Sequence, residues 1–185
     1  MDLGFRMHAE RTPNPNSIKW VLSRPVVEEG HGAHFASAPT PGESTLAAAL
    51  FEVAGVEGVF LGTSFVTVTK SEPAEWTDLA EPIVAAIRAW AEAEEPALGA
   101  DWKPPEGGAD DGIVARIVEI IDRDVRPYVA MDGGEITFAG YRDGVVEVYL
   151  QGACAGCPSS TITLKMGIES RLKEEIPEVT EVVAL

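Results

Sequence analysis

The most informative stretch of the sequence is GACAGCPSS, residues 152–160, which contains both cysteines of the chain. Apolar residues alternate before it, from Val146 to Leu150, and this period of two predicts a strand. After it, an apolar residue recurs every four positions from Leu164 to Ile176, which predicts a helix. The motif is therefore expected in a loop from a strand into a helix, with Pro158 in the first helical turn, where its missing N–H costs nothing.

The residues around the motif predict a small domain of order α-β-β-α-β. An apolar stripe predicts a first helix that begins near Ile113 and closes at Pro127. A strand begins at Ile136, and Asp143-Gly144 offers a hairpin turn before the strand that leads into the motif. After the second helix, residues 179–183 supply a last short strand.

The first half of the chain predicts a second set of helices and strands. Strands are expected over residues 18–22 and 65–69, which are rich in β-branched and aromatic residues. Helices are expected over residues 43–54 and 75–93, the latter with its apolar residues on one face. The fold class predicted for the whole chain is α+β, in two small domains.

A composition break separates the two halves. Residues 94–112 are rich in Pro, Gly and acidic residues and show no apolar periodicity, as expected for an interdomain linker. The predicted domains are therefore residues 1–93 and 113–185.

The charge of the chain restricts its partners. Lys and Arg total 14 against 30 Asp and Glu, a net charge of −16, and a surface of that sign repels phosphate backbones, so no nucleic-acid partner is expected. No apolar run approaches the roughly 20 residues that a membrane-spanning helix requires, so no membrane partner is expected. The N-terminus carries Asp2 and Glu10 and lacks the features of a signal or transit peptide, which predicts a cytoplasmic protein with reduced thiols.

Cys154 and Cys157 are the residues best suited to carry chemistry. A C-x-x-C loop holds two sulfurs within reach of one metal centre, and the positive end of a following helix favours thiolates over thiols. The same spacing also occurs in dithiol–disulfide oxidoreductases, in zinc sites and in inert structural cysteines. Two thiolates are half of what zinc or an iron-sulfur cluster generally needs, so the other ligands would come from His, from a small thiol or from a second chain.

Several separated segments resemble one known family. Together with the cysteine motif, the segments RPYVAMDGG (126–134), TLK (163–165) and IPEV (176–179) resemble the C-terminal domain of NifU, the Nfu type. The segments TPNPNSIKW (12–20), GVEGVFLG (55–62) and FVTVTK (65–70) resemble the Nfu N-terminal domain. Several segments in the family's order are a more specific signal than C-x-x-C alone.

The resemblance implies an iron-sulfur cluster scaffold or carrier. In that family the cysteines that match Cys154 and Cys157 ligate a [4Fe-4S] cluster, alternatively [2Fe-2S], shared between two chains of a homodimer. The implied partners are the upstream cluster-assembly machinery and the apo iron-sulfur client proteins that receive the cluster. The sequence departs from the family's usual pattern at Glu135, Ala155 and Thr45, and none of these changes removes a ligand.

The remaining candidates are interpreted as structural. His31 and His34 form an H-x-x-H pattern in a glycine-containing loop, and no metal is assigned to them. The stretch Asp132-Gly133-Gly134 is expected to be a helix-to-strand turn rather than a catalytic site. Lys165 and Arg171 are expected on a solvated helix face. No Ser/His/Asp grouping or phosphate-binding loop stands out, so no enzyme is predicted.

Overall fold

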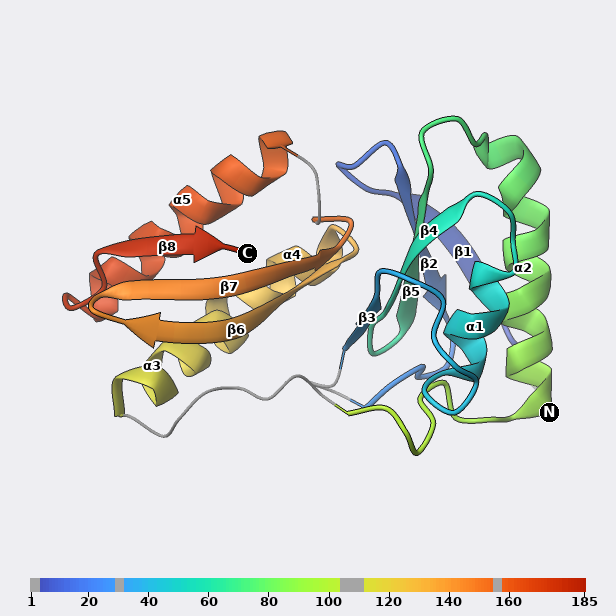
Figure 1. Ribbon diagram of the computed structural model, residues 1–185, viewed down its shortest axis with the longest axis horizontal. Coiled ribbons are helices and arrows are strands. Elements are labelled where there is room, and N and C mark those ends of the chain that lie inside the picture. The colour runs from blue at the N-terminus through green and yellow to red at the C-terminus, as the bar shows by residue number, and fades with distance from the viewer. Residues whose placement is uncertain (1–3, 29–31, 104–111, 155–157) are drawn as a thin grey trace. The chain divides into compact units, whose positions relative to one another are not determined.

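The computed structural model describes residues 4–28, 32–103, 112–154 and 158–185 (Figure 1). The chain divides into two compact units, Met1–Pro104 and Pro105–Leu185. Each unit contains helices and one β-sheet, which confirms the predicted α+β class.

The first unit contains a five-stranded antiparallel sheet. Its strands are β1 (Met7–Arg11), β2 (Ser17–Leu22), β3 (Ala33–Phe35), β4 (Val56–Leu61) and β5 (Phe65–Lys70), in the spatial order β1-β2-β5-β4-β3. Its helices are α1 (Thr45–Phe51) and α2 (Trp76–Ala93), and both lie on the same face of the sheet (Figure 1).

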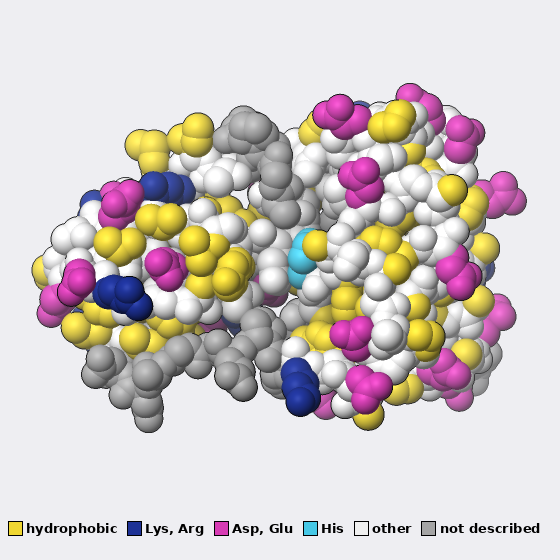
Figure 2. Space-filling model, viewed as in Figure 1, with side chains coloured by type: hydrophobic (Ala, Val, Ile, Leu, Met, Phe, Trp, Pro, Cys, Tyr) yellow, Lys and Arg dark blue, Asp and Glu magenta, His cyan; other side chains and the backbone are white. Residues whose placement is uncertain are grey.

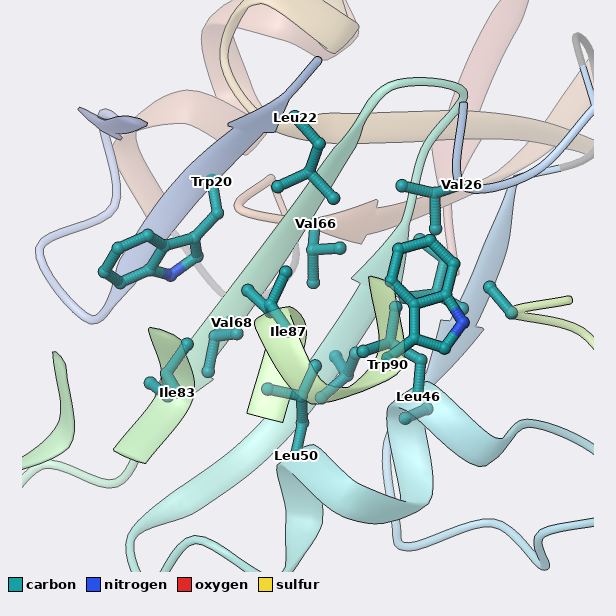
Figure 3. Close-up of a cluster of buried hydrophobic side chains, with 14 of the residues drawn as sticks. Trp20, Leu22, Val26, Leu46, Leu50, Val66, Val68, Ile83, Ile87 and Trp90 are labelled. Atoms are coloured by element: carbon teal, nitrogen blue, oxygen red, sulfur yellow. The ribbon is translucent and has the colours of Figure 1, made fainter. Parts of the chain in front are cut away.

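The core of the first unit forms where alternate strand residues meet the two helices. Figure 3 shows Trp20, Leu22, Val66 and Val68 of the sheet turned toward Leu46 and Leu50 of α1 and toward Ile83, Ile87 and Trp90 of α2. The apolar residues of α2 recur at helical spacing, so this single face is buried while the opposite face is solvated. Ser44 begins α1, because its Oγ accepts a hydrogen bond from the backbone N–H of Ala47 at 3.0 Å.

The two strands and two helices expected in this unit are confirmed, but three further strands were not expected. β1 is largely exposed and charged, and β3 has only three residues, so neither shows an apolar period. In β4 the consecutive residues Val59, Phe60 and Leu61 are all buried, so the alternation that identifies a half-buried strand is absent.

Part of the expected linker packs on the first unit. Ala97 is buried, and its carbonyl oxygen accepts a hydrogen bond from Ser44 Oγ at 2.6 Å. The backbone N–H of Gly99 donates to the Glu43 carbonyl, and Trp102 packs against the hydrophobic core. Residues 104–111 lie outside the described residues, so the boundaries of the linker remain a prediction.

The second unit has the expected order α-β-β-α-β. It consists of α3 (Gly112–Ile120), a π-helical turn η1 (Ile121–Val125), α4 (Arg126–Met131), β6 (Gly134–Arg142), β7 (Val145–Gly152), α5 (Pro158–Glu175) and β8 (Glu181–Ala184). β6 and β7 form an antiparallel hairpin whose turn has positive φ at Asp143 (49°) and Gly144 (84°). β8 pairs in parallel with β7, and α5 makes the crossover between them.

The sequence predicted that the first helix of this unit ends at Pro127. In the structure the helical segment continues through Pro127. The N–H of Arg126 bonds to the Ile121 carbonyl five residues back, which is a π-type bond, and Pro127 then falls in the first turn of α4. A proline is accommodated there because the first-turn N–H groups lack helical partners in any case. Apolar side chains of these segments, including Ile117, Ile121 and Val129, pack with those of the sheet and α5 in a second core.

Candidate functional site

Cys154 lies in the turn that directly follows β7. The last pair of the β6–β7 ladder joins Gly134 to Gly152, so the turn that enters β6 lies beside the turn that leaves β7. The N–H of Ala153 donates to the carbonyl of Gly133 at 3.2 Å, which ties the two turns together. The hairpin therefore places the first cysteine of the motif against the Asp132-Gly133-Gly134 stretch.

Glycines give both turns their shape. Gly133 has φ of +75° and Gly152 has φ of +66°, a region that L side chains rarely adopt. This confirms the prediction that Asp132-Gly133-Gly134 is a helix-to-strand turn. It also explains why glycine precedes the cysteine motif by two residues.

The Cys154 side chain is buried. It is 5% exposed and belongs to the same hydrophobic cluster as Ile136 of β6 and Ile168 of α5. Thus the thiol lies under the turn and points into the second unit rather than into solvent.

Cys157 lies outside the described residues, as does Ala155, so the predicted pair of ligands stays a prediction. α5 begins at Pro158, the position expected from the sequence, and has no acidic residue in its first turn. The motif therefore immediately precedes the N-terminus of an 18-residue helix, where the helix dipole favours negative charge such as a thiolate.

An ion pair lies next to the glycine turn. Arg126 Nε is 2.8 Å from Glu135 Oε1, and a second guanidinium nitrogen is 3.1 Å from Asp122. Burial raises the pKa of Glu135, and the Arg126 guanidinium opposes that rise. Glu135 is one of the positions at which the sequence departs from the pattern of the family that it resembles, and its carboxylate reaches Arg126.

Exposed apolar side chains occur on the two helices that adjoin the motif. Tyr128 and Met131 of α4 are 69% and 70% exposed, and Ile162 and Met166 of α5 are 64% and 65% exposed. The α4 pair comes just before the glycine turn, and the α5 pair lies in the first turns after the motif. Within the described part of the chain, no large hydrophobic residue of the first unit is comparably exposed. Exposed apolar side chains indicate a surface that contacts another protein where they form one contiguous patch.

The other candidates have structural surroundings. His34 lies in β3, where burial lowers its pKa, and His31 lies outside the described residues. Lys165 is 3.3 Å from Glu181, and Arg171 forms ion pairs with Asp124. Among the residues whose placement the structure gives, no group of three or more His, Cys, Asp or Glu side chains could hold a metal. The contact between Gly134 and Cys154 was missed from the sequence, because 20 positions separate the two residues.

Comparisons with known proteins match both halves of the chain. The model of the family described as "Scaffold protein Nfu/NifU N terminal" matches residues 7–94, and that of the "NifU-like domain" matches residues 117–183. A human protein named "NFU1 iron-sulfur cluster scaffold homolog, mitochondrial" is 41% identical over 179 residues, which are 94% of this chain and 69% of that protein. The Drosophila erecta protein of the same name is 40% identical over 181 residues, 95% of this chain and 63% of its own length.

The chain belongs to the NifU-like, Nfu-type family of iron-sulfur cluster scaffold proteins, with an Nfu N-terminal domain and a NifU-like C-terminal domain. The solution structure of a NifU-like protein from Saccharomyces cerevisiae aligns with 55% of this chain and 92% of that one, at 18% identity and a TM-score of 0.49. The family assignment therefore rests on sequence. Its members are scaffold proteins rather than a known class of enzyme.

The relatives correct one prediction. The human and Drosophila erecta relatives are both named as mitochondrial proteins, so the expectation of a cytoplasmic location is wrong. That expectation used the charge of the first residues, which tests only for a leader within those residues and carries no other information about the compartment. The expectation that no membrane helix is present was a separate one, and within the described ranges no helix is long and apolar enough to cross a bilayer.

Proposed function

We propose that the chain binds an iron-sulfur cluster through Cys154 and Cys157 and transfers it to apo-proteins. The cluster is a [4Fe-4S] cluster in this proposal, with [2Fe-2S] as the alternative. The observation that supports it best is the position of the Cys154 thiol, between a glycine-shaped hairpin end and the N-terminus of α5, in a member of a scaffold family. The cluster is cargo, and the clients and the upstream assembly machinery are its recipients and source.

The transfer is a ligand exchange. Each cysteine thiolate of the scaffold loses its bond to iron as a client thiolate forms one, so the cluster is transferred to the client with no net oxidation or reduction. Positive potential at the start of α5 stabilises the cysteine thiolates both while they bind the cluster and after the cluster has been transferred. A site near exposed apolar side chains suits this exchange better than a closed four-cysteine site within one chain.

The cluster is shared between two copies of the chain in this proposal. One chain has two cysteines, and a cluster generally takes four thiolates, so a two-fold dimer completes the site.

The local charge near the motif favours the close approach of a second acidic chain. No Asp or Glu occurs from Gln151 to Ile168, although 30 of the 185 residues are acidic. The exposed residues Ile162 and Met166 lie in this acid-free stretch.

Anaerobic reconstitution tests the assignment of the ligands. The parent protein should become brown, with visible iron-sulfur absorption and about two irons per chain, as expected for one [4Fe-4S] cluster between two chains. Cys154→Ser and Cys157→Ser should each lose stable cluster binding. Gly112→Ala, at the start of α3 and outside the acid-free stretch, where a Cβ meets nothing within 4 Å, is the matched control and should bind like the parent.

Two results would contradict the proposal. One is a Cys→Ser variant that holds a complete cluster. The other is a colourless parent protein that contains zinc, or that contains only an interconvertible disulfide, because these are the signatures of the rival uses of C-x-x-C.

A further inference from the structure

A glycine of the neighbouring strand makes the space that the Cys154 thiol occupies. Gly134 is the first residue of β6 and pairs with Gly152 in the ladder. A Cβ atom placed on Gly134 would lie 2.5 Å from Cys154 Sγ, 3.1 Å from Cys154 Cβ and 3.0 Å from the Gln151 carbonyl oxygen. Such contacts are shorter than real van der Waals contacts, so the thiol fills the volume that a side chain at position 134 would need.

The need for glycine at this position is steric, not conformational. Gly133 has a positive φ, and its glycine is explained by backbone angle alone. Gly134 lies in a strand, whose backbone conformation any L residue can adopt. Glycine is therefore needed at position 133 for its backbone angle and at position 134 for its lack of a side chain. Only Gly134 affects the space that the Cys154 thiol occupies.

The surroundings leave little room for adjustment. Cys154 is 5% exposed and belongs to the same buried cluster as Ile136 and Ile168, so protein atoms enclose its side chain on most sides. The Gln151 oxygen belongs to the backbone of β7 and is held by the strand. A methyl group at position 134 would therefore turn the thiol away from β6, toward solvent, or separate the ends of the two strands.

We propose that Gly134 is a positioning residue for Cys154. By contributing no side chain, it forms a recess that directs the Cys154 Sγ inward and shields it from solvent in the cluster-free chain. This inference rests on the proposed function, in which Cys154 is a cluster ligand, for its relevance to cluster binding. The recess itself is a property of the metal-free chain and can be measured there.

Alkylation of the thiol tests the recess directly. In the full chain carrying Cys157→Ser, Cys154 is the only thiol, and its reaction with iodoacetamide can be followed by mass spectrometry under native, metal-free conditions. Adding Gly134→Ala should raise the rate by about tenfold or more, since a thiol forced out of the recess no longer depends on local opening. Equal rates in the Cys157→Ser protein and in the folded Cys157→Ser, Gly134→Ala protein would overturn the inference.

Gly140→Ala is the matched control. It is the same substitution in the same strand, but its Cβ would meet only the Glu147 Oε2 atom at 3.2 Å, the far end of a flexible side chain. In the Cys157→Ser background, Gly140→Ala should leave the Cys154 alkylation rate within about twofold, because the control changes no contact of the recess. A tenfold increase in this control as well would mean that any glycine change in β6 loosens the turn, which overturns a specific role for Gly134.

A double-mutant cycle keeps the inference testable if Gly134→Ala is unstable. Gly134→Ala should lower the urea midpoint in the parent and lower it less in a Cys154→Ala background, where Sγ no longer occupies the recess. An equal loss in both backgrounds would show that the clash does not involve the thiol, and would overturn the inference. Because these measurements use metal-free protein, they are separate from the cluster test. An alkylation rate that Gly134→Ala does not change would contradict the recess but not the ligand proposal. A Cys154→Ser variant with a complete cluster would contradict the ligand proposal but not the recess.

Discussion

Single residues set the geometry of the second unit where the chain changes direction. Turn chemistry at these points could be predicted from the sequence, because Asp143-Gly144 and Asp132-Gly133-Gly134 are local signals whose backbone preferences do not depend on the rest of the fold. Both turns were found. The contact of Gly134 with Cys154 could not be predicted in this way, since it exists only after the β6–β7 register brings the two turns together.

The hairpin turn offers a clean test of backbone preference. Asp143 is exposed and has φ of +49°, a region in which Asp and Asn are tolerated better than residues without a short polar side chain. Asp143→Ala should lower the free energy of unfolding by about 1 kcal/mol, and Asp143→Asn should leave it within a few tenths. Urea unfolding followed by circular dichroism measures both. An alanine variant as stable as the asparagine variant would show that the turn does not limit stability.

At the scale of elements, strongly periodic segments were predicted and the interruptions between them were not. α2 and α5 follow from apolar spacing, because buried residues recur along the face of α2 and at every fourth position of α5 from Leu164 to Leu172. The π-helical turn η1 gives no such signal, since a single i→i+5 bond changes neither composition nor period enough to be seen. Charged residues of η1 reach α5. Asp124 accepts hydrogen bonds from Arg123 at 2.8 Å and from Arg171 at 2.7 Å.

This contact between η1 and α5 predicts a dependence of stability on pH. The Arg123 guanidinium, followed by that of Arg171, holds the pKa of Asp124 well below its ordinary value of 3.8. A carboxylate with a lowered folded-state pKa contributes stability above its unfolded pKa and loses that contribution as the pH falls toward the folded value. Asp124→Asn should therefore lower the thermal midpoint at neutral pH by a few degrees, and the difference from the parent should shrink below about pH 4.

Thermal unfolding of the variant and the parent at each pH measures this difference, with Glu119→Gln, an exposed carboxylate of α3, as the control for loss of one negative charge. A difference for Asp124→Asn that is the same at neutral and at acid pH would mean that the hydrogen bonds are not charge-dependent. A control that behaves like Asp124→Asn would assign the effect to net charge instead of to the contact with α5.

At the scale of the whole molecule, the two-part organisation was visible in composition, but its boundary was not. Acidic and Pro/Gly-rich residues marked the end of the first half, yet Ala97 and Trp102 within that stretch pack on the first unit. The few apolar residues of this stretch show no regular spacing, so composition averaged over the stretch concealed their packing. The division into domains of residues 1–93 and 113–185 remains a proposal, and a fragment of the first domain should extend to residue 103 to keep these contacts.

Net charge acts on the whole molecule and opposes its proposed assembly. Each chain carries a net charge of −16, and acidic side chains are spread over the visible face of the first unit (Figure 2). Two such chains repel at low salt, so the metal-free protein should be largely monomeric, with iron–thiolate bonds supplying the free energy that joins two chains. Binding of the cluster and dimerisation are then thermodynamically linked, because each one stabilises the other.

Anaerobic sedimentation of metal-free and loaded protein measures this linkage. Loading should shift the mass toward the dimer, with iron moving in the same boundary as the dimer. Raising the salt concentration toward about 1 M, where the Debye length is about 3 Å, should increase the dimer fraction at a given loading because it screens the repulsion between the chains. Loaded protein that sediments as a monomer with a complete cluster would refute bridging and would assign the remaining ligands to a small thiol. A dimer fraction that falls as the salt concentration increases would instead show that the two chains attract each other through their charges. The proposal that iron–thiolate bonds overcome a net charge repulsion would then be wrong.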